Sequence, residues 1–241
     1  MTGATERPLA ARLNKAGVAR IITVVLTLAV TALIFFLAAG TFQASRAWLY
    51  YGGVLAYLVA AMAVIFRFFP EAIETVNARG KLNRDVKTWD KLFGLCYVVL
   101  YLLQPALAGW DVRTKHSFDV PWHVAVLALA VTILAYALIH WAMLVNKHAE
   151  TGVRIQEERD HSVISSGPYR IVRHPFYVSA IASHLIYPLA LGSPHAAIPA
   201  VAIALLVVWR TAREDEVLCR ELEGYEAFTK HTRYRLVPGV W

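Results

Sequence analysis

The feature that most constrains the fold of this chain is a series of apolar runs, because their lengths and number determine how it can meet a membrane. Residues 21–39 carry no charged side chain. At about 1.5 Å per residue, a helix of this length crosses a hydrocarbon core of roughly 30 Å. The run exceeds the apolar core of a signal peptide, so we interpret it as a retained first span. Five further apolar runs follow, at residues 47–66, 92–108, 122–145, 176–191 and 196–209.

Composition and charge predict a membrane-embedded, all-α helical bundle. Hydrophobic residues make up 58% of the 241 residues and charged residues only 17%, against roughly 25% charged residues in a soluble domain. The 24 Lys and Arg residues fall as 21 on one side of the expected spans and 3 on the other. By the positive-inside rule, this asymmetry predicts about six transmembrane helices with both termini in the cytoplasm. The net charge of +7 indicates contact with anionic lipid and does not imply nucleic acid.

The segments between the apolar runs predict how the spans are arranged. Residues 70–90 are too polar to span and indicate an interfacial elbow or helix on the cytoplasmic face. The last two runs are short, with Pro188 breaking the first of them and a tight turn at residues 192–194, so they predict a helical hairpin. Beyond Trp209 we expect the sixth span to continue as an amphipathic cytoplasmic helix, against which Gly224 is a mild objection.

The longest polar connection after the fourth span, residues 146–177, is the candidate functional segment. Two helices can be joined by far fewer residues, and long connections without regular structure are usually functional. This segment and the helix after Trp209 flank the same short hairpin, so we expect them to meet at its cytoplasmic mouth. The side chains brought together there would be Gln156, His161, Tyr169, Arg173, His174 and Tyr177 from the segment, and Arg210, Arg213, Glu214, Asp215 and Glu216 from the helix.

Such a set of side chains suits a charged, zwitterionic small molecule, held by charge-assisted hydrogen bonds. None of the 13 glycines forms a Gly-x-Gly pattern, so a nucleotide-binding domain of the Rossmann kind is not expected. Cys96 and Cys219 are too few for a zinc cluster or a disulfide framework, and no metal site is expected. The plain alternative is a solvated basic loop, with residues 214–216 on a solvated helix face. In that interpretation His140 and His184 are neutral residues that hydrogen bond to neighbouring helices.

Two blocks of the chain resemble the signatures of a known family. Val163-Ile164-Ser165-Ser166-Gly167-Pro168-Tyr169 followed by Arg173-His174-Pro175-Phe176-Tyr177 is similar to the signature of the isoprenylcysteine carboxyl methyltransferase family. Arg213-Glu214-Asp215-Glu216 with a closing Arg-Tyr-Arg-Leu-Val-Pro-Gly resembles its second signature. The resemblance covers roughly residues 122–241. It implies a membrane helical bundle whose final hairpin and cytoplasmic segments enclose S-adenosylmethionine, with a lipophilic acceptor entering from the bilayer.

The resemblance also implies roles for individual residues. Those expected to line the cofactor site are Gln156, His161, Val163, Gly167, Tyr169, His174, Tyr177, Glu214 and Asp215. The expected catalytic residues are Arg173, Arg213 and Glu214, the two arginines orienting the acidic pair or the acceptor. The family often has two Glu where this chain has Glu214-Asp215, so the sequence leaves open which carboxylate takes the acidic role. We accordingly divide the chain into residues 1–108, with three spans and the elbow, and residues 109–241, a methyltransferase-like core.

The sequence leaves open both the methyl acceptor and the class of protein. A carboxylate acceptor needs no base, whereas a thiol or amine acceptor would need one, for which His161, His174 and Glu214 are candidates. A rival enzyme hypothesis is a membrane reductase of the sterol C14 type, which resembles this scaffold and uses NADPH. The rival without catalysis is a small transporter or membrane scaffold.

Overall fold

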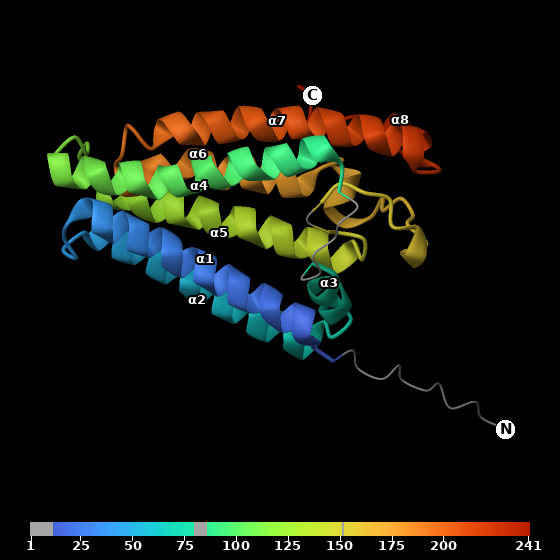
Figure 1. Cartoon of the computed structure of the whole chain (residues 1–241), viewed down its shortest axis with the longest axis horizontal. Coiled ribbons are helices and arrows are strands. Elements are labelled where there is room, and N and C mark those ends of the chain that lie inside the picture. The colour runs from blue at the N-terminus through green and yellow to red at the C-terminus, as the bar shows by residue number, and fades with distance from the viewer. Residues whose placement is uncertain (1–11, 80–85, 151) are drawn as a thin grey trace.

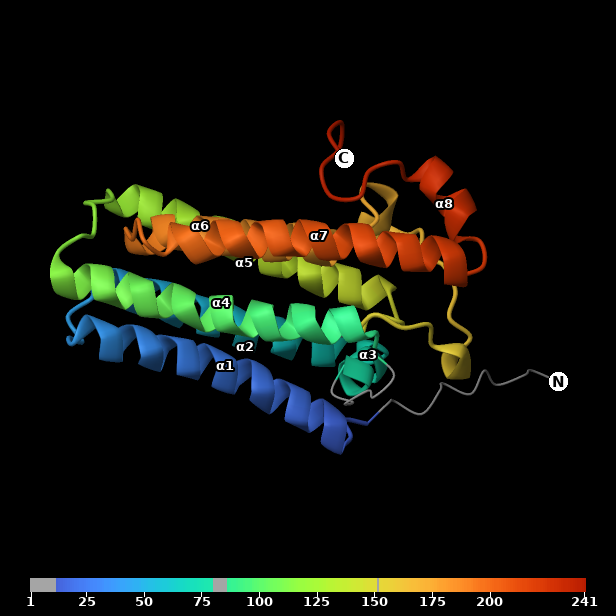
Figure 2. The ribbon, with the colours of Figure 1, turned by 45° about the horizontal axis from the view of Figure 1, so that its top comes forward.

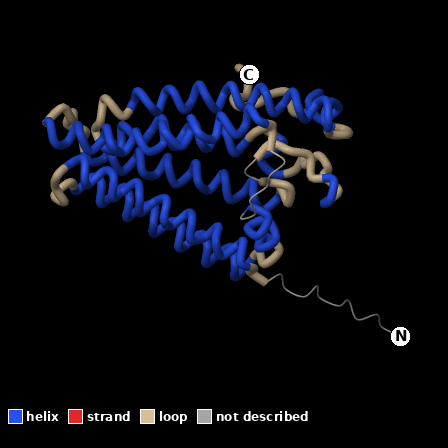
Figure 3. The backbone as a smooth tube through the Cα atoms, viewed as in Figure 1, coloured by secondary structure: helices blue, strands red, loops and turns tan. Residues whose placement is uncertain are grey.

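The protein is all-helical in the residues that its structure, a computed structural model, describes: 12–79, 86–150 and 152–241 (Figure 1). No strand occurs among these residues (Figure 3), and the prediction of an all-α membrane bundle is confirmed. The α-helices are α1 (Lys15–Ala39), α2 (Ser45–Phe68), α3 (Ala72–Arg79), α4 (Thr88–Thr114), α5 (Trp122–Val145), α6 (Pro175–Leu191), α7 (Ala197–Glu221) and α8 (Tyr225–His231). Two short 3-10 helices, η1 (Glu157–Arg159) and η2 (Gly167–Arg170), lie between α5 and α6.

Among the described residues, four helices, α1, α2, α4 and α5, are long and apolar enough to cross a membrane. They correspond to the first four expected spans. Helices α1, α2 and α4 extend past the predicted limits, because polar residues at the end of a span can still complete its helical hydrogen bonds. Helix α6 is a shorter apolar helix, and α7 is apolar only before its charged second half. Helices α6 and α7 form the expected short hairpin, although among the described residues neither is one of the helices long and apolar enough to count as a membrane span.

Helices α1, α2, α4, α5, α6 and α7 run side by side along the long axis of the molecule, and the short helices α3 and α8 lie at one end (Figures 1 and 2). Neighbours pack in the circular order α1, α4, α7, α6, α5 and α2, with α2 against α1 again. One buried cluster fills the end of the bundle away from α3, where aromatic side chains such as Phe35, Tyr51 and Tyr187 pack with small residues. A second cluster, which includes Tyr169 and Phe228, lies at the end that carries α3 and α8. We call this second end the site end.

Pro188 lies inside α6 without breaking it, so the predicted break is wrong. A proline has no N–H and leaves the carbonyl four residues earlier without its helical partner. That carbonyl, of His184, accepts a hydrogen bond from the side-chain amide of Gln104 at 2.9 Å. The His184 ring also bonds this amide, through Nδ1 at 2.7 Å. Both membrane histidines hydrogen bond to neighbouring helices as expected, since His140 Nδ1 lies 2.8 Å from the Tyr57 hydroxyl.

Gly192 and Asp111 tie the α6–α7 hairpin to α4 at the end opposite the site end. Gly192 has a φ of 68°, and a Cβ there would lie 2.7 Å from the carbonyl oxygen of Phe118, so glycine fits this turn. The buried Asp111 carboxylate accepts from the Ser193 hydroxyl at 2.5 Å and from the His195 N–H at 3.1 Å. These partners allow α4 to continue beyond its expected apolar run with a charged group inside the bundle.

The two polar segments predicted outside the spans, the elbow at residues 70–90 and the chain after Trp209, both contain helices at the site end. Helix α3 lies in the predicted elbow, whose residues 80–85 lie outside the described residues, as do residues 1–11 of the expected N-terminal part. Helix α7 continues past Trp209 to Glu221, as predicted. It ends before Gly224, which has a φ of 79° and precedes α8. Gly224 is therefore a helix boundary and not a weak point within one long helix.

Candidate functional site

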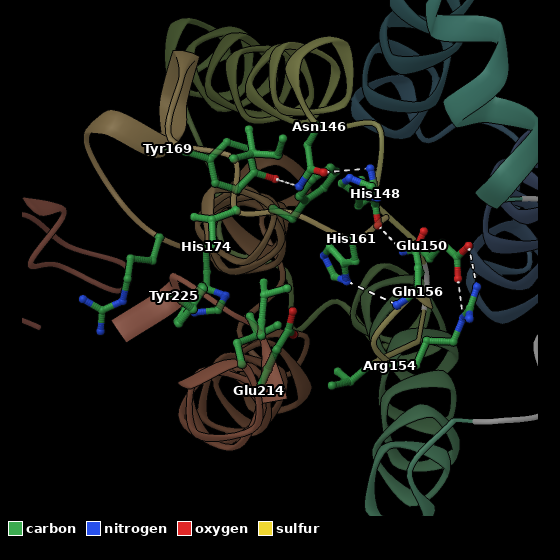
Figure 4. A pocket seen from close by; sticks show the side chains of 18 of the residues that line it. Asn146, His148, Glu150, Arg154, Gln156, His161, Tyr169, His174, Glu214 and Tyr225 are labelled. Carbon is green, nitrogen blue, oxygen red and sulfur yellow. Dashed lines mark hydrogen bonds and ion pairs between the residues drawn. The ribbon is translucent and has the colours of Figure 1, made fainter. Parts of the chain in front are cut away.

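A cavity of about 210 Å³ lies at the site end. Its walls come from α3, the loop at residues 146–164, η2, the start of α6, and from α7 and α8 (Figure 4). The loop and the two hairpin helices therefore surround one space, which is the arrangement that the sequence predicts.

The loop after α5 is folded against itself by its own side chains. Arg154 donates to the Glu150 carboxylate from Nε at 2.9 Å and from Nη2 at 3.1 Å. Gln156 is almost fully buried, donates from Nε2 to the His148 carbonyl at 2.6 Å, and accepts from Arg159 Nη1 at 3.0 Å. Gln156 thus lines the cavity while its amide holds two parts of the loop together.

Two imidazoles meet at this wall of the cavity. The rings of His148 and His161 lie 4.6 Å apart, and His161 Nδ1 accepts from the Gln156 backbone N–H at 3.3 Å. His148 is 4% exposed, and neither of its ring nitrogens has a hydrogen-bond partner among the described residues. Burial lowers the pKa of His161 to about 4, with His148 and Arg154 adding to the effect, and burial also lowers the pKa of His148. Both rings are therefore neutral near pH 7 and can exchange hydrogen bonds with a ligand.

Glu214 of α7 and Tyr177 of α6 contact each other at the opposite wall. The Tyr177 hydroxyl donates a hydrogen bond to the Glu214 carboxylate, and both side chains line the cavity. Arg210, one turn earlier on α7, forms an ion pair with Asp90 of α4 at 2.8 Å and lies over the rings of Phe93 and Tyr177. A phenol and a guanidinium thus flank the carboxylate that the hairpin presents to the cavity.

Asp215, the next residue on α7, lies outside the cavity lining and is 2% exposed. It accepts two parallel bonds from Arg173, Nε to Oδ1 and Nη2 to Oδ2, both at 2.9 Å. It also accepts from Arg235 Nε at 2.7 Å and from the Tyr225 hydroxyl at 2.8 Å. Burial alone would raise the pKa of Asp215, but hydrogen bonds from His174 and Arg173 outweigh it and hold that pKa well below its usual value. Asp215 is therefore an ionised, buried anchor.

The C-terminal segment, residues 232–241, docks behind the start of α6. Arg173 donates from Nη1 to the carbonyls of Thr232 and Arg233, at 2.9 and 2.7 Å. The Thr232 hydroxyl donates to the Tyr169 carbonyl at 3.0 Å. Every guanidinium nitrogen of Arg173 thus has an acceptor within the protein. Although Arg173 lines the cavity, its bonds hold the wall of the site together.

An apolar wall lies next to these charged groups. Asn146 donates from Nδ2 to the Tyr169 hydroxyl at 2.7 Å, which fixes the Tyr169 ring against the end of α5. Side chains from the loop, α7 and α8 pack with it, including Val163, Leu222 and Phe228. A ligand in this cavity would meet an aromatic and aliphatic surface on one side and charges of both signs on the other.

The structure brings together most of the residues that the sequence predicts for the site. Arg213 lies on the exposed face of α7 and pairs with Glu216 at 3.2 Å. Gly167 begins η2, and like Asp215 it does not line the cavity. The nine predicted residues that do line it are Gln156, His161, Val163, Tyr169, Arg173, His174, Tyr177, Arg210 and Glu214.

Several polar groups at the cavity are not predicted from the sequence. Asn146, His148, Glu150 and Arg154 belong to the same polar connection as the signature, and that position was the available signal. Arg79 comes from α3, far earlier in the chain, and only the packing of α3 brings it to the cavity. In the described part of the chain, no three His, Cys, Asp or Glu side chains are grouped in a way that could hold a metal ion.

Comparison with protein families matches the part of the chain that forms most of the cavity. Residues 126–220 match the model of the isoprenylcysteine carboxyl methyltransferase (ICMT) family, which confirms the resemblance expected from the sequence. No curated protein matches the chain. The match spans nearly all of α5, the loop, α6 and nearly all of α7, and leaves α1 to α4 and α8 outside. It supports a membrane methyltransferase in general, in a family whose enzymes generally use S-adenosylmethionine.

Proposed function

We propose that this protein is an integral membrane methyltransferase that binds S-adenosylmethionine in the cavity. It would transfer the methyl group to a lipophilic acceptor, or to a small carboxylate, thiol or amine, reached from the bilayer. The observation that carries the proposal is the contact between Tyr177 and Glu214 at one cavity, inside the stretch that matches the family. This pair links the signature after the loop to the signature on α7.

The residues at the cavity fit the chemistry of this cofactor, which carries an ammonium, a carboxylate, ribose hydroxyls and an adenine ring. Glu214 is suited to the ammonium or the ribose hydroxyls, and the neutral rings of His148 and His161 can bond polar groups of either kind. The apolar wall at Tyr169 and Leu222 offers a surface for a base. When bound, the cofactor supplies an electrophilic methyl group.

The protein's own part in such a transfer is to align the acceptor and to exclude water. Orientation alone contributes about 7–11 kcal/mol in favourable cases. His174 is held in place, with Nε2 3.1 Å from Asp215 and its ring stacked on Tyr177 at 5.6 Å. A carboxylate acceptor would need no base. For a thiol or amine acceptor, the candidates His161, His174 and Glu214 all line the cavity.

We further propose that the site end faces the cytoplasm. Helix α1 begins there, and α8 lies there too (Figure 1). Arg46, Arg113 and Lys115, the basic residues of the sparsely charged side, lie at the other end, next to the start of α2 and the end of α4. The positive-inside rule then assigns the cavity and both termini to the cytoplasmic side.

Binding of radiolabelled S-adenosylmethionine to the purified protein tests the proposed function. We expect saturable binding that S-adenosylhomocysteine displaces and NADPH does not, since displacement by NADPH would favour the reductase. Glu214→Ala and His174→Ala should each weaken binding about tenfold or more, because each removes a polar group that lines the cavity. Glu216→Ala, which changes an exposed carboxylate on the same helix, should bind like the wild type. No binding by the wild type, or unchanged binding by both cavity variants, would refute the proposal.

A further inference from the structure

Arg79 brings a positive charge to the cavity from outside the stretch that matches the family. It is the last residue of α3, and its side chain lines the cavity. Its guanidinium lies over the ring of Phe176, 5.0 Å from the centroid, and Nη1 donates a long hydrogen bond, 3.4 Å, to the Ala149 carbonyl. Helix α3 packs against α1 and α5. Arg79 thus stands where the elbow, the loop and the first turn of α6 meet.

The charge of Arg79 has no counter-ion among the described residues. Within the described part of the chain, no carboxylate lies within ion-pair distance of Arg79, and its buried Nε has no hydrogen-bond partner. The other three cavity arginines differ: Arg210 pairs with Asp90, Arg173 with Asp215 and Arg154 with Glu150. Burial, with the charge of Arg20 on α1 adding to it, lowers the pKa of Arg79 to about 10. Arg79 therefore stays charged near pH 7 in a place that disfavours an unpaired charge.

The Arg79 side chain is half-buried, with its Nε fully buried, and a charge that is shielded from water without a counter-ion is costly. An anionic ligand would supply the missing counter-ion. The planar guanidinium matches the geometry of carboxylate and phosphate groups. The guanidinium lies over the ring of Phe176, which belongs to the first turn of the apolar helix α6. A ligand bound to Arg79 would therefore meet an apolar surface beside its charged end. These features describe an amphiphile with an anionic head.

We propose that Arg79 determines acceptor specificity by binding an anionic group, a carboxylate or a phosphate, at the polar end of a lipophilic acceptor. That the ligand is the acceptor rests on the proposed function. The binding of an anionic amphiphile at Arg79 does not rest on it.

The experiment measures binding of three probes with the same C12 chain, dodecanoate, dodecyl phosphate and dodecanol, to the purified full-length protein in a nonionic detergent. We expect at least one of the two anions to bind about ten- to a hundredfold more tightly than the alcohol, as a charge-assisted hydrogen bond predicts. The stronger anion then identifies the head group. In Arg79→Gln this preference should disappear.

Arg67→Gln is the matched control, because Arg67 is an exposed arginine on α2 that also lies over a ring, Phe68 at 5.3 Å, but does not line the cavity. It should keep the preference for the anion. Arg79→Met gives a second readout: without added amphiphile its melting temperature should be equal to or higher than that of the wild type, since an unpaired charge is removed. A purely structural arginine would instead lower it.

Three outcomes would overturn the inference. They are equal binding of all three probes by the wild type, a preference for the anion that survives in Arg79→Gln, and a loss of cofactor affinity in Arg79→Gln without any change in probe binding. The last outcome would mean that Arg79 holds the cofactor. If the anions bind through Arg79 but the wild type binds no S-adenosylmethionine, the proposed function fails and the anion site stands.

Discussion

Substitutions at Glu214 and Asp215 should show that these two adjacent carboxylates have different functions. Successive side chains on a helix point roughly 100° apart, and on α7 this places Glu214 at the cavity, bonded to Tyr177, and Asp215 in the packed region around Arg173. Glu214→Gln and Asp215→Asn keep the size of each side chain and remove its charge. We expect the first to weaken cofactor binding and the second to lower stability.

The magnitude for Asp215→Asn follows from its partners. The carboxylate neutralises Arg173, which is only 7% exposed, and also binds Arg235 at 2.7 Å. Removing one member of a buried ion pair costs about 3–5 kcal/mol. In a chain of this size each kcal/mol lowers the melting temperature by about 2–4 °C, so we expect a decrease of about 6–20 °C. Glu214 borders a cavity and not a packed core, and its substitution should change the melting temperature by less than about 3 °C.

The assay combines three measurements on each variant: thermal unfolding in a nonionic detergent, trypsin digestion, and binding of radiolabelled cofactor. If Asp215 anchors residues 232–241, the bonds after Arg233 and Arg235 should become accessible to trypsin in Asp215→Asn at protease concentrations that leave the wild type intact. Glu216→Gln is the matched control, since its carboxylate forms only exposed ion pairs, and such pairs contribute roughly 0–1 kcal/mol.

The reasoning is wrong if Asp215→Asn melts within about 2 °C of the wild type and keeps its C-terminal segment protected. It is also wrong if Glu214→Gln proves the less stable of the two variants. Loss of cofactor binding in Asp215→Asn with unchanged stability and protease resistance would show that Asp215 acts at the cavity.

Two further predictions concern pH and a turn. The pKa of His161 is about 4 in the folded protein against an ordinary 6.5, so the unfolded chain binds this proton more tightly and stability falls as pH drops from about 6.5 towards 4. The melting temperature should fall less between pH 7.5 and pH 5.0 in His161→Asn than in the wild type, and equal decreases would contradict this. Gly192→Ala should lower the melting temperature by about 2–12 °C, because its positive φ and the Phe118 carbonyl impose a strain of order 1–3 kcal/mol. Gly52→Ala, with open space around it, is the control, and equal melting of the two variants would contradict the argument.

The spans were predictable because a bilayer forces backbone hydrogen bonds to close within helices, and long uncharged runs mark where this happens. The helix ends were less predictable, since they depend on partners that are distant in sequence. Asp111 continues α4 because Ser193 and His195 arrive from the hairpin turn. Pro188 stays helical because Gln104 of another helix takes up the freed carbonyl.

The position of the site was predictable on similar grounds, because a polar connection and a charged helix that flank one short hairpin must meet at its mouth. The roles of adjacent residues were not. Neither the separation of Glu214 from Asp215 nor the exposure of Arg213 is visible in a run of four charged letters. The sequence around Arg79 gives no sign of its role, because this role depends on the packing of α3, which brings Arg79 to the cavity without a counter-ion from the described residues.

The two walls of the cavity are joined through the C-terminal segment, and this gives the segment a functional consequence although it lies outside the family match. Arg173 and His174 lie directly before α6, and Asp215 belongs to α7. Residues 232–241 bind to both Arg173 and Asp215. The backbone N–H of His174 donates to the Arg235 carbonyl at 3.0 Å, so a residue that faces the cavity is fixed by the end of the chain. Loss of the segment should therefore loosen the entry to α6 and weaken ligand binding, even though none of residues 232–241 lines the cavity.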